Sequence, residues 1–179
     1  SNLSAGNGSA LSFVETVDSE VVSSTLSGAE YGVYFAGASS GININDSSIV
    51  SSIDALRFMN YATVAANFTN TSLNESDMHI HTVDVNFDVY FKEYVDVNVT
   101  NATGMLSGAT VTATDTNAAL QASGSTDGSA LLRLAIPRLY VEYNHPGPRT
   151  DNLLNNYTIN ATAPTYAANW TTVNVTNSS

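Results

Sequence analysis

Gly32-Val33-Tyr34-Phe35 and Ala55-Leu56-Arg57-Phe58 are two copies of one short apolar pattern, about 23 residues apart. We align a third copy, His79-Ile80-His81-Thr82, about 24 residues after the second. A second set of positions repeats with the same two spacings: Ser24-Thr25-Leu26, Ser47-Ser48-Ile49 and Thr71-Ser72-Leu73. Short strands separated by turns at this period are typical of a parallel β-solenoid, in which each coil leaves an apolar face that its neighbour covers. Residues 1–90 are therefore predicted to form a short parallel β-solenoid or an irregular β region.

A helix is the alternative for part of this region. Residues 53–61 could form one, with Ser52 as the N-cap and with Ile53, Leu56 and Tyr61 on one face. The next stretch, 67–76, is polar and loop-like, which limits such a helix to about four turns. Both interpretations stay open from the sequence.

Residues 83–99 alternate between apolar and polar side chains. The apolar positions are Val83, Val85, Phe87, Val89, Phe91, Val95, Val97 and Val99. This period of two continues far beyond a typical strand, so we predict one long strand that runs from the first region into a second one. We place the boundary near residues 90–94, and the second region spans 91–179.

The second region is predicted to be an immunoglobulin-like, prealbumin-type β-sandwich. Turn residues separate six further short strands, at 109–115, 120–123, 130–136, 139–143, 157–161 and 170–175. With the long strand, this makes seven strands in about 85 residues, which fits such a sandwich. Asp127-Gly128 predicts a tight hairpin. The polar, Pro-containing stretch 144–156 predicts a long exposed loop.

The composition excludes several classes of protein. The 179 residues include 16 acidic and 5 basic side chains, a net charge of -11, and no cysteine. Such a charge repels phosphates, so no nucleic-acid partner is expected. The lack of cysteine excludes disulfides, thiolate zinc sites and cysteine nucleophiles. No apolar run approaches the roughly 18 to 20 residues that span a bilayer, so no membrane span is expected.

Asparagine, serine and threonine supply most of the polarity. Of 20 asparagines, 13 stand in Asn-x-Ser/Thr sequons, where simple proportion predicts about five. The sequon asparagines are Asn2, Asn7, Asn45, Asn67, Asn70, Asn74, Asn98, Asn101, Asn156, Asn160, Asn169, Asn174 and Asn177. This excess predicts dense covalent N-linked glycosylation and an extracellular, cell-surface location. Glycans would also explain how a chain with only 12% charged residues stays soluble.

Three segments of the second region resemble the carboxypeptidase-regulatory-like family of β-sandwiches. They are Gly104-Met105-Leu106-Ser107-Gly108-Ala109-Thr110-Val111, then Ser125-Thr126-Asp127-Gly128-Ser129-Ala130, and Tyr157-Thr158-Ile159-Asn160-Ala161. Leu106 departs from the family pattern, which has proline there. Together with the repeats, the chain resembles secreted surface proteins of methanogen-type archaea, which join β-helix repeats to such sandwiches. The resemblance implies a piece of an envelope, sheath or filament, and accessory sandwiches of this kind bring no catalytic residues.

Few side chains suggest chemistry. His79 and His81 fall on one face of a strand, where Asp77 and Asp84 could complete a metal shell, but an ordinary solvated face is the better explanation. We expect no metal and no cofactor. The carboxylate pairs Asp84 with Asp88 and Glu93 with Asp96 have the spacing of an ordinary polar face.

The sequence as a whole predicts a structural extracellular glycoprotein without enzymatic activity, which assembles with copies of itself by strand addition. The apolar segment 10–17 is the candidate strand for this addition. A carbohydrate-binding adhesin is the alternative, with Tyr31, Tyr34 and Tyr61 as its aromatic row. A β-helix polysaccharide-degrading enzyme is the third, although Arg57 is the only base before Lys92.

Overall fold

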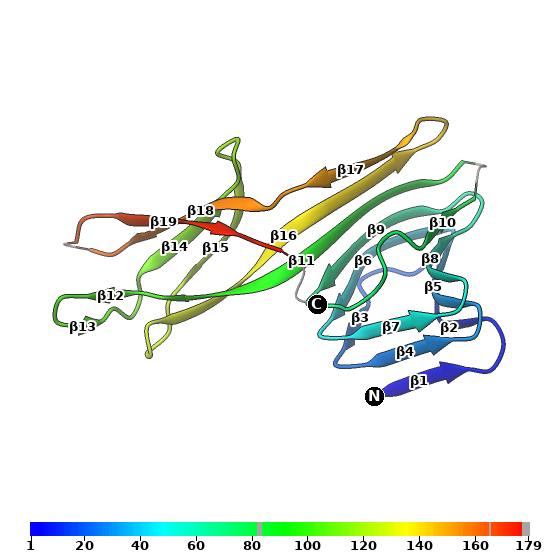
Figure 1. The fold of residues 1–179 in the computed structure, drawn as a ribbon, viewed down its shortest axis with the longest axis horizontal. Coiled ribbons are helices and arrows are strands. Elements are labelled where there is room, and N and C mark those ends of the chain that lie inside the picture. The colour runs from blue at the N-terminus through cyan, green and yellow to red at the C-terminus, as the bar shows by residue number, and fades with distance from the viewer. Residues whose placement is uncertain (82–83, 165, 177–179) are drawn as a thin grey trace. The chain divides into compact units, whose positions relative to one another are not determined.

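The computed structural model describes residues 1–81, 84–164 and 166–176, and all regular structure in them is β-strand (Figure 1). The prediction of an all-β protein is therefore confirmed. The chain groups into two compact units. The first comprises Ser1–Phe91 and Tyr140–Asn152, and the second comprises Lys92–Leu139 and the described residues from Leu153 onward. The sequence-based division placed 140–152 in the second region, whereas their contacts group them with the first.

Most of the first unit is a parallel solenoid of stacked sheets. Its strands are β1 (Asn2–Ala5), β2 (Ser9–Val14), β3 (Glu20–Val22), β4 (Thr25–Gly28), β5 (Tyr31–Ala36), β6 (Ala38–Asn45), β7 (Ser48–Ser51), β8 (Asp54–Phe58), β9 (Thr63–Thr69) and β10 (Met78–Ile80). Each coil gives one strand to each of three sheets, ordered β1-β4-β7, β10-β8-β5-β2 and, within a larger sheet, β9-β6-β3. The neighbouring strands of successive coils pair in parallel.

Equivalent side chains stack from coil to coil and form the core. Leu26 pairs with Leu3 on one side and Ile49 on the other, and both Leu26 and Ile49 are buried. The rings of Phe13, Phe35 and Phe58 stack with centroid distances of 5.5 and 5.2 Å. The spacing predicted between the first two copies is confirmed here, since Phe35 pairs with Phe58 and Leu26 with Ile49.

The alignment of the third copy of the first pattern is wrong. Phe58 pairs with Ile80 and Leu56 with Met78, whereas the sequence alignment matched Phe58 with Thr82 and Leu56 with Ile80. A shift of two positions leaves the same side chains on the same face of a strand, so hydrophobic pattern alone does not separate the two registers. An earlier copy also exists that the sequence patterns did not reveal, because Phe13 pairs with Phe35.

The helical alternative for residues 53–61 is wrong. Residues 54–58 form β8, which lies between β5 and β10 in a parallel sheet. Ala55, Leu56 and Phe58 are all buried. Pairing with strands on both sides satisfies the backbone of this segment, and its inward side chains join the stacked core, so tertiary contacts override the local helical pattern.

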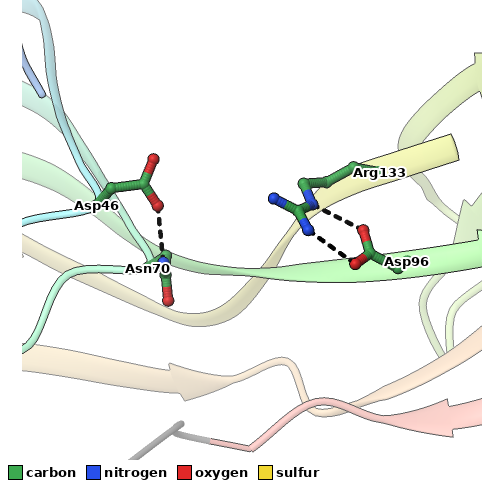
Figure 2. Close-up of polar contacts among 4 residues, drawn as sticks. All are labelled: Asp46, Asn70, Asp96 and Arg133. Carbon is green, nitrogen blue, oxygen red and sulfur yellow. Dashed lines mark hydrogen bonds and ion pairs between the residues drawn. The ribbon is translucent and has the colours of Figure 1, made fainter. Parts of the chain in front are cut away.

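The coil corners use left-handed backbone at equivalent positions. Ser23, Asp46 and Asn70 have φ values of 49°, 50° and 48°. Asparagine and aspartate tolerate this conformation better than most residues. Asn70 Nδ2 donates a hydrogen bond of 2.7 Å to Asp46 Oδ1, which links two successive corners (Figure 2).

Gly32 is required inside a coil. A Cβ atom at this position would lie 2.2 Å from Cγ2 of Ile49 and 2.7 Å from the carbonyl oxygen of Ala55. Gly32 therefore permits a close approach between neighbouring segments that any larger residue would prevent.

Two long strands continue the largest sheet, which is ordered β17-β16-β11-β9-β6-β3. They are β11 (Asn86–Asn98) and β16 (Leu131–Asn144), followed by β17 (Arg149–Leu153). The predicted alternation along β11 is confirmed, since Phe87, Val89 and Phe91 are buried; Val83 lies outside the described residues. The two strands expected at 130–136 and 139–143 are one strand, β16. The loop expected at 144–156 contains β17, so that prediction is wrong.

The second unit has an antiparallel sheet ordered β15-β14-β18-β19. The strands are β14 (Thr110–Thr114), β15 (Leu120–Ser125), β18 (Asn156–Thr162) and β19 (Asn169–Asn174), and a small hairpin joins β12 (Thr100–Asn101) to β13 (Gly104–Met105). Side chains from β14, β16 and β18 form one core cluster: Val111, Ala113, Leu134, Ile136, Tyr157 and Ile159, together with Val175. The immunoglobulin-like assignment remains a prediction.

The hairpin predicted at Asp127-Gly128 is not formed. β15 pairs with β14, whereas the following strand, β16, belongs to another sheet. Asp127 Oδ1 instead accepts hydrogen bonds from the backbone N–H groups of Ser129 and Leu131. Such an aspartate stabilises a turn locally, without specifying which strands pair on either side of it.

Candidate functional site

Polar ladders cover the outer face of the strands β3, β6 and β9. Asn67 Nδ2 donates to Asn43 Oδ1 at 3.1 Å, and Asn45 Nδ2 donates to Glu20 Oε1 at 2.9 Å. These bonds join side chains of neighbouring coils. Three of these four side chains are neutral amides, which take much of the place of the lysine and glutamate that usually cover an exposed sheet.

None of the described sequon asparagines is buried. Asn2, Asn7, Asn70, Asn74, Asn98, Asn156, Asn169 and Asn174 are exposed, and Asn45, Asn67, Asn101 and Asn160 are half-buried. Asn177 lies outside the described residues. An enzyme that transfers a glycan needs access to the asparagine side chain, and the fold leaves part of the residue exposed at all twelve described positions.

Within the described residues, the first coil has strand edges without a neighbour, and we call it the open first coil. β1, β2 and β3 stand last in their sheet orders, so each has a neighbour on one side only. Leu3 is 41% exposed, whereas Leu26 and Ile49, its equivalents in the next two coils, are 0% and 5% exposed. Unpaired strand edges and uncovered core positions of this kind are suited to pairing with another strand.

The segment 10–17, the candidate for strand addition, contributes to this first coil. Most of it lies in β2, which pairs in parallel with β5. Its residue Phe13 is 4% exposed and stacks on Phe35. Strand addition would therefore use the outer edge of β2, with the strand kept in its own sheet.

The two histidines do not gather further ligands. The rings of His79 and His81 lie with their centroids 6.1 Å apart. Within the ranges that the structure describes, no group of three or more His, Cys, Asp or Glu side chains could hold a metal. Asp84, one of the expected additional ligands, lies 3.5 Å from Nδ1 of His145 instead.

The carboxylates of the long strands contact basic or phenolic groups. Glu93 and Arg138 form a buried ion pair with an Oε1–Nε distance of 3.0 Å. Asp96 accepts two hydrogen bonds from Arg133, of 2.7 and 2.8 Å, which lower the pKa of Asp96 (Figure 2). Asp88 accepts from the hydroxyl of Tyr140. The carboxylates of Asp84, Asp88, Glu93 and Asp96 therefore each contact a different side chain, and neither candidate pair acts together.

Two stacked tyrosines lie beside acidic groups on the polar face of the first unit. The rings of Tyr90 and Tyr140 are 4.6 Å apart, and the hydroxyl of Tyr140 also lies 3.1 Å from Glu142 Oε2. Burial, and then the nearby carboxylates, raise the pKa of both tyrosines above the usual value. The arrangement keeps both phenols protonated, and it links β11 to β16.

The predicted aromatic row lies only partly on the surface. Tyr31 and Tyr34, both on β5, are half-buried, and the guanidinium of Arg57 lies 4.4 Å above the ring of Tyr31. Tyr61 is 66% exposed at a turn. Of the three rings, that of Tyr61 is exposed, that of Tyr31 is covered by Arg57, and that of Tyr34 is half-buried.

A groove in the second unit brings together residues that the sequence patterns did not connect with one another. It has a volume of about 350 Å³, and Trp170, 69% exposed, and Tyr166, 49% exposed, are among its lining residues. The sequence assigns Trp170 only to a strand. Alternation with its polar neighbours Asn169 and Thr171 would predict a buried Trp170, so no local pattern revealed its exposure.

Fold and surface define an all-β protein with a parallel solenoid unit, a sequon-rich polar surface and an open first coil. Comparisons with protein-family models, with curated proteins and with solved structures gave no match. Among the described residues, no helix has the length and apolar character to cross a membrane.

Proposed function

We propose that the protein is a structural module of an extracellular, N-glycosylated surface protein, and that it associates with copies of itself through its first coil. The observation that carries the proposal is the exposure of Leu3, whose equivalents Leu26 and Ile49 are buried. A solenoid core that ends uncovered is stabilised when a further strand layer stacks on it. The accessible sequons support the glycosylated, extracellular part of the proposal.

Association would use the free edges of β1, β2 and β3. Backbone N–H and C=O groups on these edges can pair with strands of a second copy, as in other cases of β-augmentation. Leu3 would be covered at the same time, and Val14 and Val22, which are 57% and 47% exposed, flank the contact. No catalytic step belongs to this function.

The test is the oligomeric state of the full chain, by light scattering and electron microscopy at rising concentration. We expect association by about 100 μM, and Leu3→Lys should abolish it, since a charge would be buried in the contact. Ile53→Lys is the matched control, because Ile53 is 56% exposed in the bend between β7 and β8, outside the edges of β1, β2 and β3. A wild-type chain that stays monomeric, or equal effects of both substitutions, would overturn the self-association.

Substitution is a sharper test than truncation. Deletion of the segment 1–20 removes the candidate strand, but it also uncovers the second coil, whose strands β4, β5 and β6 have an equivalent shape. The new end could then associate in the same way.

Glycosylation is tested separately by glycopeptide mass mapping of the protein from its native source. We expect glycan masses on several of the sequon asparagines. Unmodified asparagine at every sequon would contradict the glycoprotein assignment, and it would leave the self-association to its own test.

A further inference from the structure

The groove in the second unit combines exposed aromatic rings with neutral polar side chains. Trp170 and Tyr166 lie on it, together with Asn98, Asn101, Thr162 and Asn169. Trp170 belongs to β19, where it pairs with Asn160 of β18, so the sheet fixes its backbone. A tryptophan that is 69% exposed on an ordered strand presents a large rigid apolar surface to solvent.

The described residues that line the groove include no charged side chain. A ligand with phosphate, sulfate or carboxylate groups would find no cation to compensate it, and a cationic ligand would find no carboxylate. The lining therefore matches an uncharged ligand that has both apolar and hydrogen-bonding surfaces.

Two amide side chains are already oriented by the backbone. Asn101 Oδ1 accepts hydrogen bonds of 2.8 Å from the N–H groups of Thr103 and Gly104. Asn169 Oδ1 accepts one of 2.9 Å from the N–H of Trp170. Because the oxygens are used in this way, Nδ2 of each amide is the group that can donate to a ligand.

From these features we propose that the groove binds a neutral oligosaccharide. A pyranose ring has an apolar C–H face, which can stack on Trp170 or Tyr166, and hydroxyl groups at its rim, which can accept from Asn101 and Asn169. The volume of about 350 Å³ is within the range of small-ligand sites. This site differs from the tyrosines Tyr31, Tyr34 and Tyr61, which belong to the first unit.

The inference does not rest on the proposed glycosylation or self-association. Asn98, Asn101 and Asn169 are themselves sequon residues, so attached glycans would compete for the same groove. The experiment therefore uses the full chain produced without N-glycans, in which the groove is accessible to added sugar.

Trp170 is the only tryptophan of the chain, so its fluorescence reports on the groove directly. The probes are cellotriose, mannotriose and triacetylchitotriose, each titrated to about 10 mM, with trigalacturonic acid as the acidic counterpart. We expect a saturable blue shift with at least one neutral trisaccharide and at least about tenfold weaker binding of the acidic one. No shift with any neutral probe, or equal binding of the acidic probe, would overturn the proposal.

Variants test the residues. Tyr166→Ala and Asn101→Asp should each weaken binding about tenfold or more, and Trp170→Ala should abolish it, as followed by saturation-transfer NMR. Tyr61→Ala, at an even more exposed tyrosine of the first unit, is the control and should bind like wild type. Since Trp170 and Tyr166 are exposed, their variants should keep the wild-type unfolding midpoint. Unchanged binding in all three groove variants would assign the sugar to another surface.

Discussion

The two units build their cores in different ways. In the solenoid, Phe35 lies between its own equivalents, Phe13 and Phe58, so each layer is covered by a copy of itself. In the second unit, Val111, Ile136 and Tyr157 come from three unlike strands and surround one another. A repeating core leaves its outermost described layer exposed, as Leu3 shows, whereas a core of unlike strands can cover itself. Self-association is therefore expected of the first unit.

The largest expected effect concerns the ring stack. Phe58 lies between Phe35 and Phe87, with ring centroids at 5.2 and 4.3 Å, so Phe58→Ala should lower the free energy of unfolding by about 3 to 5 kcal/mol. Phe13 belongs to the first coil and stacks on Phe35, so Phe13→Ala should cost about 3 kcal/mol, at the lower end of that range. Urea unfolding of both variants measures the difference. Equal losses would show that the first coil is as well covered as the third.

The second unit contains a buried ion pair between Glu93 and Arg138. Glu93→Ala removes the carboxylate of this pair while Arg138 stays buried. The substitution should lower the free energy of unfolding by about 3 kcal/mol. Replacing both partners, as Glu93→Leu with Arg138→Met, should recover most of this loss because neither charge remains. Urea unfolding of the single and double variants checks it. A double variant as unstable as the single one would mean that the ion pair itself stabilises the unit.

Alkaline pH should weaken the core of the second unit. Burial raises the pKa of Tyr157 to about 12, and its hydroxyl donates to the carbonyl of Pro137. A raised folded-state pKa gives stability that is complete below the unfolded value near 10 and is lost as pH rises toward 12. Tyr157→Phe should reduce this pH dependence, at a cost of about 1 kcal/mol at neutral pH. Unfolding at pH 8 to about 11.5 tests it, with Tyr61→Phe, at an exposed tyrosine, as the control.

The smallest effect concerns acid pH. The backbone N–H groups of Ala119 and Asn117 donate to Asp115, and they lower its pKa. A lowered folded-state pKa gives stability that is present above about pH 4 and is lost as pH falls through the folded value. Asp115→Asn should therefore flatten the dependence of unfolding free energy on pH below about 4. An unchanged slope of unfolding free energy against pH would show that Asp115 does not contribute to the loss of stability in acid.

The repetitive unit could be predicted from the sequence better than the other. Val33 and Leu56 could be paired correctly because two copies of one pattern identify each other. The copy around Ile80 was misplaced by two positions, since a period of two gives both registers the same buried face. Local signals at Asp127-Gly128 described a turn correctly but did not reveal that the strands around it belong to different sheets.

The candidate groove was beyond sequence reasoning for a related reason. Asn98 and Trp170 are far apart in the chain, and their meeting depends on strand pairing that no short pattern encodes. The sequons, by contrast, are local signals, and none of the twelve described sequon asparagines is buried.

The matching corners at Ser23, Asp46 and Asn70 also bear on how such a protein can evolve. Because each corner has the same backbone conformation, a duplicated coil could be inserted between two existing ones without disturbing either. One unequal crossover between coil-length segments of the gene would then lengthen the solenoid by one strand spacing, about 4.8 Å. Length would change in discrete steps, while the groove of the second unit and the exposed first coil would both be inherited intact.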